Sequence, residues 1–478
     1  MAFRNFFILA ALISAIAAPA QIRLEVLKQS HIGDKMRLVG ITEPGASVTV
    51  NGKAVHVYDS GTFGDEFAMK DGDNDFKITA SKNKLSKTIT VTEHHPAPKP
   101  EKKDTQPIVS QSITPTLVKT LEGAYLQYGV AGDRLGGSKM GYLDPGVTLQ
   151  ASEEYGDLYR VNLSANRDAY IPKKFTEPDG EGPLEQVASG TVSISNSGKC
   201  DRVFIRLPKR VAYRSFTSLD PSTITVEIFS VRNNSNWITH KRGLGMIDYV
   251  DVVQTEADVM QLIIHLKRKH NWGYTVHYDK SGLAIEVKHV PSLKLADMTI
   301  GLDAGHGGSY PGSLGYTGLT EKEINLTLIK LVKERLEKRG AKVVLTRADD
   351  SEVSMPERNR IFRDAKVDLA ISIHNNSGGS PLMEMGSSTY YKHLFCMPLA
   401  RVMRKHLLSL GFKDFGMTGN FNFSLSQPTD YPSVLLEVLF MSSLADEEKL
   451  LSPKWRQRIA DSVVAGLEEY LDEAKKDK

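Results

Sequence analysis

Four side chains in the last third of the chain could act together in metal-assisted hydrolysis. His306 follows an apolar run that ends at Asp303, His374 ends the run LAISIH, and Glu437 lies within VLLEVLF. Glu321 opens a long amphipathic segment between the two histidines. Two histidines and one carboxylate are a ligand set that zinc uses in catalytic sites, where a fourth position stays open for water. We therefore consider a zinc hydrolase first.

Each of these residues also has a simpler explanation when it is taken alone. A single histidine after a strand is most often structural, and an acidic residue at a helix start interacts favourably with the helix dipole. An unpaired carboxylate would be costly inside VLLEVLF, so Glu437 is balanced between a structural and a functional role. Glu323 fits a capping box with Thr320, which leaves Glu321 free to face the loop of His306.

The co-occurrence of these residues predicts a division of labour. Zinc on His306, Glu321 and His374 would lower the pKa of a bound water to about 7 and polarise a substrate carbonyl. Glu437 would then be the non-ligating carboxylate that carries the proton. The glycine-rich stretch LDAGHGGSYPG could instead suggest a phosphate-binding loop, but no Gly-Lys-Ser/Thr follows it and the Rossmann spacing is missing.

The segments that must position these residues alternate between apolar runs and one clear helix, which indicates an α/β domain. The expected strands are MTIGLDA, AKVVLTR, VDLAISIH and SVLLEVLF, and EKEINLTLIKLVKERLEKRG is the expected helix. Its apolar residues recur at helical spacing, and Gly340 should end it. Parallel strands would bring functional loops together at their carboxyl ends.

The preceding residues read as all-β. Alternating runs around Asn51-Gly52 predict a hairpin within residues 21–93. Residues 94–116 are rich in Pro and Lys and predict an extended linker, in which His94 and His95 would simply be solvated. Short alternating strands are expected over 117–176 and again over 187–290.

Composition narrows the compartment and the partners. The formal net charge of the 478 residues is only +3, which gives no case for nucleic acid. Residues 1–20 have a basic start, a short apolar core and small residues up to Ala20, the order of a cleaved secretory signal rather than a membrane span. The mature protein is thus expected outside the cytoplasmic membrane without stable membrane insertion. The two cysteines, Cys200 and Cys396, are expected to be free buried thiols.

Five motifs of the C-terminal part resemble one enzyme family. LDAGHGG, LTEKEINL, LTRADD, ISIHNNS and PSVLLEVLF occur in the order seen in type 3, zinc-dependent N-acetylmuramoyl-L-alanine amidases. The resemblance covers residues 297–472 and implies one zinc ion on His306, Glu321 and His374, with Glu437 as the catalytic acid/base. It also implies peptidoglycan as the substrate and leaves open a protein activator, with a role in wall remodelling or daughter-cell separation.

The β-rich segments carry resemblances of their own. Residues 21–93 resemble small bacterial immunoglobulin-like domains, 117–176 resemble a bacterial SH3-type barrel, and 187–290 resemble the wall-targeting domain that precedes many secreted amidases. The expected architecture is therefore multidomain: all-β N-terminal accessory domains, then a C-terminal α/β zinc hydrolase domain with a mainly parallel sheet.

Some features depart from the family pattern, and alternatives remain open. Leu439 and Ser443 stand where the family usually has Gly and Asn, which could reshape the loop after Glu437. Arg347 and Arg358 match family positions, but a structural salt-bridge role is at least as well supported. The short interval between His374 and Glu437 predicts no built-in inhibitory helix. The competing functions are a zinc peptidase acting within the stem peptide and a catalytically silent wall-binding scaffold.

Overall fold

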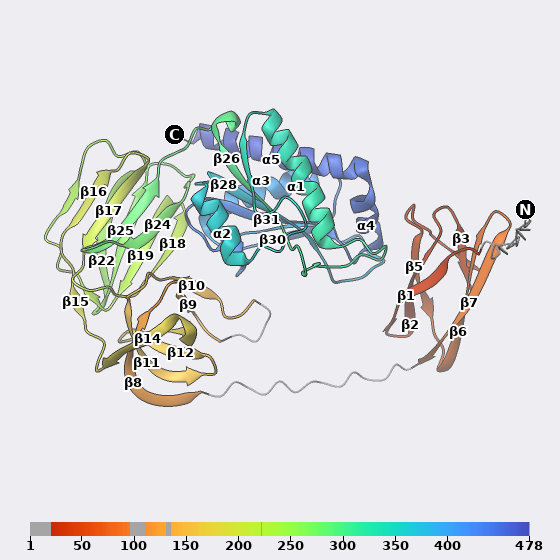
Figure 1. Cartoon of the computed structure of the whole chain (residues 1–478), viewed down its shortest axis with the longest axis horizontal. Helices are drawn as coiled ribbons and strands as arrows, with labels where there is room; N and C mark the ends of the chain where they lie inside the picture. The colour runs from red at the N-terminus through yellow and green to blue at the C-terminus, as the bar shows by residue number, and fades with distance from the viewer. Residues whose placement is uncertain (1–20, 96–109, 131–134, 221, 478) are drawn as a thin grey trace, which may run out of the picture. The chain divides into compact units, whose positions relative to one another are not determined.

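The computed structural model describes residues 21–95, 110–130, 135–220 and 222–477 (Figure 1). The expected signal segment 1–20 lies outside the described residues, as does most of the expected linker. The chain divides into one compact unit up to Pro100 and a larger one from Glu101 onward. Within the described residues, no helix combines the length and apolarity needed to cross a membrane.

The first unit is all-β. The turn at Asn51 and Gly52 has positive φ at both residues, as a two-residue hairpin turn requires. His94 and His95 lie at the end of the last strand rather than in a linker, and Nδ1 of His94 is 2.7 Å from a carboxylate oxygen of Asp73. The strands form two sheets, β1(Leu24–Ile32)-β2(Lys35–Thr42)-β5(Thr62–Ala68) and β4(Lys53–Val55)-β3(Ser47–Val50)-β6(Gly72–Lys82)-β7(Leu85–His95).

The second unit begins with a seven-stranded sheet, which we call the 111–181 sheet. It starts within the segment expected to be a linker because β8 pairs with β11 from Gln111 onward, and it ends beyond residue 176 because β14 pairs with the second half of β8. Its order is β10(Lys139–Tyr142)-β9(Tyr125–Gln127)-β13(Arg167–Pro172)-β12(Leu158–Ser164)-β11(Thr148–Tyr155)-β8(Gln111–Thr120)-β14(Thr176–Glu181), and η1(Lys173–Phe175) links β13 to β14.

Residues 187–288 form two further antiparallel layers with a shared apolar core. One has the order β21(Ile238–His240)-β16(Val192–Asn196)-β17(Cys200–Arg206)-β25(Gly282–Lys288)-β24(Tyr274–Tyr278), in which only the β16–β21 pair is parallel. The other is β18(Tyr213–Leu219)-β19(Ser222–Phe229)-β23(Val259–Leu266)-β22(Ile247–Glu256), and β15(Val187–Ala188) pairs with β20(Val231–Arg232). Both cysteines are free as expected, although Cys200 is only half-buried.

The C-terminal part is a six-stranded mixed sheet between helices (Figure 1). The four expected strands are present, and two short strands that the sequence pattern did not predict, β29 and β30, extend the sheet beyond β31. β29 runs antiparallel to β31, whereas the other strand pairs are parallel. The order is β27(Lys342–Leu345)-β26(Thr299–Ala304)-β28(Leu369–Asn376)-β31(Ser433–Phe440)-β29(Ser387–Tyr390)-β30(Asp414–Thr418).

Helices cover both faces of this sheet. α1, α3 and α5 pack with one another and with the main core, whereas α2 and η4 belong to a smaller apolar cluster around Phe362. The predicted helix is confirmed as α1, and Gly340 follows its end with the positive φ that favours glycine. The bounds are η2(Leu295–Asp297), α1(Glu321–Lys338), α2(Met355–Asp364), η3(Leu394–Cys396), α3(Met397–Leu408), η4(Ser424–Ser426), α4(Leu444–Leu451) and α5(Pro453–Lys476).

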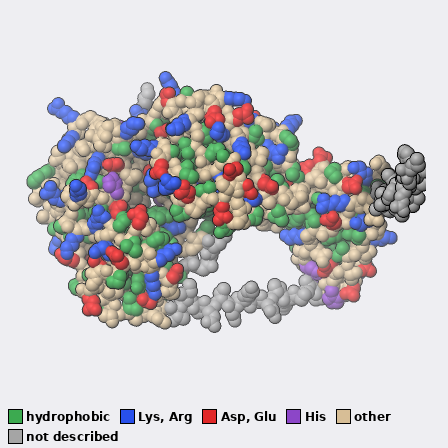
Figure 2. All heavy atoms as spheres, in the orientation of Figure 1, with side chains coloured by type: hydrophobic (Ala, Val, Ile, Leu, Met, Phe, Trp, Pro, Cys, Tyr) green, Lys and Arg blue, Asp and Glu red, His purple; other side chains and the backbone are tan. Residues whose placement is uncertain are grey.

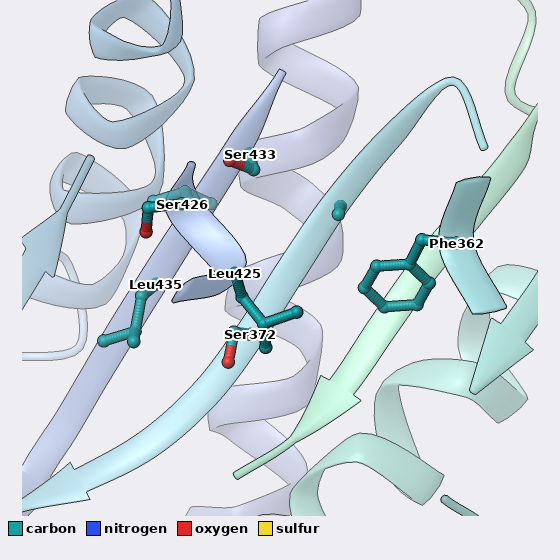
Figure 3. Close-up of a pocket in the computed structure, with 8 residues that line it drawn as sticks. Phe362, Ser372, Leu425, Ser426, Ser433 and Leu435 are labelled. Atoms are coloured by element: carbon teal, nitrogen blue, oxygen red, sulfur yellow. The ribbon is translucent and has the colours of Figure 1, made fainter. Parts of the chain in front are cut away.

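The face drawn in Figure 2 carries Lys and Arg interspersed with Asp and Glu, as the small net charge suggests. A cavity of about 10 Å³ lies beneath η4, between Phe362, Leu425 and the serines of β28 and β31 (Figure 3). It holds at most one water molecule, so it is a packing defect rather than a substrate site.

One buried carboxylate organises the 187–288 layers. Asp201 is fully buried and accepts hydrogen bonds from the backbone N–H groups of Gly245, Met246 and Ile247, at 2.6 to 3.0 Å. Nε2 of His289 lies 2.8 Å from Oδ1 of Asp201. Burial alone would raise the pKa of Asp201, but these donors more than offset it and hold the pKa below its usual value.

We expect Asp201→Asn to lower the free energy of unfolding at pH 7 by about 1.5–3 kcal/mol, because charge-assisted hydrogen bonds are lost at a buried site. The folded-state pKa lies below the unfolded value of about 3.9, so the carboxylate stabilises the fold above that pH. The stabilisation is lost as the pH falls through the folded-state pKa. Urea unfolding at pH 7 and pH 3 measures both effects.

Asp248→Asn is the matched control, since Asp248 is an exposed carboxylate next to the same turn. It should change the free energy of unfolding by less than about 0.5 kcal/mol. Equal losses for the two variants at pH 7, or a loss for Asp201→Asn that does not shrink on acidification, would contradict this role of Asp201.

Candidate metal centre

His306, Glu321 and His374 converge in the structure. Candidate ligand atoms of the three residues all lie within 4.8 Å of one another. One carboxylate oxygen of Glu321, Oε1, lies 3.1 Å from Nε2 of His306 and 3.0 Å from Nδ1 of His374. The two imidazole rings meet edge to face with centroids 5.0 Å apart. The three residues predicted from the sequence thus share one small volume.

Neighbouring parallel strands bring the two histidines together. β26 and β28 pair in parallel register, with Ala304 opposite Ile373. The carboxyl ends of the two strands therefore lie side by side at the same end of the sheet. His306 then turns back with φ of 63°, an uncommon backbone conformation for a residue other than glycine. Glu321 is the first residue of α1, and Glu323 accepts from the N–H of Thr320 at 3.1 Å, as the capping box predicted.

Glycines give these side chains the space they occupy. A Cβ on Gly305 would lie 2.3 Å from the His374 ring, and one on Gly312 would lie 2.5 Å from Oε2 of Glu321. Both approaches are closer than real Cβ contacts allow, so any larger residue would displace a member of the cluster. The glycines of this loop therefore clear room for the histidine–glutamate cluster.

The charges of the cluster are strongly coupled. Burial would raise the pKa of Glu321, but hydrogen bonds to His306 and His374 hold it far below its usual range. Burial likewise opposes the charged form of His374, yet the adjacent Glu321 raises the pKa of His374 overall. Nε2 of His374 is buried without a hydrogen-bond partner among the described residues. A buried carboxylate with two imidazoles and an unused ring nitrogen is a donor set suited to a divalent cation.

Glu437 lies next to this cluster without belonging to it. It pairs in register with His374 on the neighbouring strand β31. It is partly exposed, and its charge contributes to the raised pKa of His374. A carboxylate beside the cluster, rather than within it, is placed to exchange protons with a reacting group.

Asp303, the second-to-last residue of β26, is not part of the cluster. It is fully buried and pairs with Arg358 at 2.6 Å, with Thr346 and Ser372 donating to the same carboxylate. Arg358 also donates to the backbone oxygen of His306 at 2.7 Å. Burial would raise the pKa of Asp303, but the Arg358 guanidinium holds it below its usual value. This ion pair fixes the backbone on which His306 sits.

Arg347 has a comparable structural role. Its guanidinium donates to the backbone oxygens of Ala304, Gly305 and Lys322, at 2.8 to 3.0 Å. It therefore ties the loop after β26 to the first turn of α1. Arg358 thus forms an ion pair of the kind considered from the sequence, whereas the contacts of Arg347 are hydrogen bonds to backbone oxygens.

Two asparagines near Glu321 escaped the sequence analysis. The backbone N–H of Asn375 donates to Oε1 of Glu321 at 3.2 Å, and the Asn325 amide approaches the same oxygen at 3.4 Å. Asn375 also donates to Asn325 at 2.8 Å. Asn325 lies four residues after Glu321 on α1, so helical spacing could have identified it. Nothing in the sequence pattern links Asn375 to α1.

The residues that depart from the family pattern have local explanations. Ser443 caps α4 by accepting from the N–H of Asp446, and Leu439 is fully buried in the main core. Neither contacts the histidine–glutamate cluster in the hydrogen bonds described.

Comparison with known proteins places this geometry in a family. The family model described as N-acetylmuramoyl-L-alanine amidase matches residues 300–469. The probable cell wall amidase LytH of Staphylococcus saprophyticus is 31% identical over 256 residues, which cover 53% of this chain and 80% of LytH. The uncharacterized protein YqiI of Bacillus subtilis is 34% identical over 180 residues, 37% of this chain and 85% of YqiI.

A solved structure is similar to the same part of the chain. The catalytic domain of CwlV, an N-acetylmuramoyl-L-alanine amidase from Bacillus (Paenibacillus) polymyxa var. colistinus, is 33% identical, and the match covers 37% of this chain and 98% of that domain with a TM-score of 0.35. With the family match and the extent of the LytH and YqiI alignments, the chain belongs to the N-acetylmuramoyl-L-alanine amidase family of peptidoglycan amidases.

Proposed function

We propose that the chain cleaves the amide bond between N-acetylmuramic acid and L-alanine in peptidoglycan with one zinc ion. His306, Glu321 and His374 would hold the ion. The observation that carries this proposal is their convergence within 4.8 Å around a buried carboxylate. The accessory β structure and the expected secretory signal support action outside the cytoplasmic membrane, in wall remodelling or daughter-cell separation.

The residues present fit such an ion. The buried Nε2 of His374 has no partner among the described residues, and Gly305 and Gly312 leave space where a side chain would otherwise intrude. A bound zinc ion lowers the pKa of water to about 7 and polarises a carbonyl group. The carboxylate of Glu321, which is the acidic member of the cluster, would then face a cation instead of relying on protonated imidazoles.

The chain's own contribution to the reaction is proton transfer and orientation. Glu437 would accept a proton from the water that attacks the lactyl carbonyl carbon. As the C–N bond breaks, Glu437 would return that proton to the alanine nitrogen. The products are a muramoyl carboxylate and a stem peptide with a free amino terminus. A peptidase acting within the stem would release a different amino terminus, and a silent scaffold would release none.

We expect Glu437→Gln to lower kcat on purified peptidoglycan by about 10²- to 10⁴-fold, because the amide cannot accept the proton. Labelling of new amino termini should identify L-alanine for the wild type. The variant should keep its zinc, since Glu437 is not among the three clustered residues. Glu468→Gln, which removes an exposed carboxylate from α5, should keep full activity. Unchanged activity in Glu437→Gln would rule out this proton carrier.

A chelator should abolish activity, and one equivalent of zinc should restore it, because three of the proposed ligands come from this chain. His374→Ala should bind less than one zinc ion per chain by atomic absorption. His406→Ala, which alters a histidine on α3 paired with Glu469, is the control and should bind one. Full activity after complete metal removal would refute zinc dependence.

Gly305→Ala should weaken zinc binding by about tenfold or more, because the new Cβ would push the His374 ring out of place. Zinc affinity measured by competition with a chromogenic chelator tests this effect. Gly141→Ala is the control, since a Cβ there meets no atom within 4 Å. Equal zinc affinities of the two variants would show that the clearance at Gly305 is not needed.

A further inference from the structure

A chain of aromatic rings borders the candidate metal centre. The ring of Phe423 meets His374 edge to face at 5.6 Å, Phe421 stacks beside Phe423 at 6.0 Å, and Tyr390 packs on Phe421 at 4.7 Å. These three aromatic side chains are only partly buried. Phe421 and Phe423 belong to the segment 419–427, which runs from the end of β30 to the residue after η4 and which we call the aromatic loop.

Asn422, which lies between the two phenylalanines, forms hydrogen bonds with residues 135–139 of the 111–181 sheet. Nδ2 of Asn422 donates to the backbone oxygens of Leu135 and Gly137 at 3.0 and 2.9 Å. Its Oδ1 accepts from the backbone N–H of Lys139 at 3.1 Å and from the Gln427 amide at 3.1 Å. Leu135 and Gly137 lie in the connection between β9 and β10, and Lys139 is the first residue of β10, an outer strand of the 111–181 sheet. One side chain thus satisfies both donor and acceptor groups of a hairpin nearly 300 residues away in sequence.

The chain also forms hydrogen bonds with β24 just after the aromatic loop, at Thr429. The backbone N–H of Tyr274, at the start of β24, donates to the oxygen of Thr429 at 2.7 Å, and the Thr429 hydroxyl donates back to the oxygen of Tyr274 at 2.8 Å. His393 lies 2.8 Å from the backbone oxygen of Gln427 through Nε2. Burial lowers the pKa of His393 to about 4, so the ring is neutral and this nitrogen is the donor at neutral pH. The loop beside the metal centre is therefore held both by the catalytic part, where the N–H of Phe421 donates to the oxygen of Tyr391 at 3.0 Å, and by β structure outside the catalytic sheet.

We propose that the 135–139 segment is a structural part of the amidase active site and that Asn422 is the positioning residue through which it holds the aromatic loop. The loop then presents the Phe421 and Tyr390 rings as one wall for the muramoyl group of the substrate, an apolar surface beside the reacting amide. This inference rests on the proposed amidase function. It assigns the 111–181 sheet a role in substrate positioning, in addition to any role in wall attachment.

The test uses the full chain with the substitutions Asn422→Ala and Gly137→Ala. Asn422→Ala removes the contacts from the catalytic side. Gly137→Ala distorts the hairpin from the other side, since its Cβ would lie 2.1 Å from the backbone oxygen of Gly129. We expect both to raise KM for a soluble muramoyl peptide about 3- to 10-fold, with kcat and zinc content near the wild-type values.

Two matched controls accompany them. Asn236→Ala alters an exposed asparagine of the 187–288 layers, outside both segments, and Gly141→Ala alters a glycine of the same hairpin whose Cβ would meet no atom within 4 Å. Both controls should keep the wild-type KM. Hydrogen exchange should show faster exchange in both 135–139 and 419–427 for the two test variants, and in neither segment for the controls.

Wild-type KM values in Asn422→Ala and Gly137→Ala would overturn the proposal, and so would an exchange increase confined to one of the two segments. Equal loss of kcat and zinc would also overturn it, because it would indicate general damage rather than positioning. If the wild type released no L-alanine amino termini, the proposed function itself would fail, while the exchange measurement would still report on the Asn422 contact.

Discussion

The candidate site depends on the contacts that the buried carboxylate of Glu321 makes with His306 and His374. One oxygen of this carboxylate lies within 3.1 Å of a nitrogen on each of His306 and His374, in a position almost closed to water. A buried carboxylate is stable only when positive charge or strong donors surround it. The surrounding residues hold the three segments that carry His306, Glu321 and His374 close enough for the two imidazoles to surround this carboxylate.

The surrounding residues act mostly through backbone contacts and space. The Asp303–Arg358 pair fixes the turn that carries His306, and Arg347 binds that turn to the start of α1. Gly305 and Gly312 leave free the volume in which a side chain would separate His306, Glu321 and His374. None of these residues belongs to the cluster, yet each acts on the positions of its members. Preorganised supports of this kind are what a metal site needs to keep its ligands oriented.

The β structure outside the catalytic sheet contributes to the same task. The aromatic loop has partners in the catalytic part, where the N–H of Phe421 donates to the oxygen of Tyr391 at 3.0 Å, and Asn422 adds contacts to the 111–181 sheet. Thr429, just after the loop, adds a contact to β24. A loop held by separate layers has less conformational freedom than one held by its own flanking strands alone. Hydrogen bonds from side chains to backbone oxygens therefore tie the accessory β structure to a segment of the amidase part.

Sequence patterns captured the elements whose residues repeat regularly. α1 and the four apolar strands follow from periodicity, and the capping contact of Glu323 follows from capping chemistry. β29 and β30 escape prediction because they are only four and five residues long, and His94 resembles a linker residue because prolines follow it closely. The limits of the 111–181 sheet differ from the prediction because the first half of β8 and the whole of β14 are rich in polar residues and proline, which are not typical of strands.

By itself, the sequence determined which residues could form a metal centre and which enzyme family they resemble, because ligand chemistry and motif order are local properties of the chain. Only the tertiary structure decided that Asp303 pairs with Arg358, that Asn375 reaches Glu321, and that Asn422 binds a hairpin of another sheet. These contacts join residues tens to hundreds of positions apart. They depend on strand order and packing, which no spacing within a segment encodes.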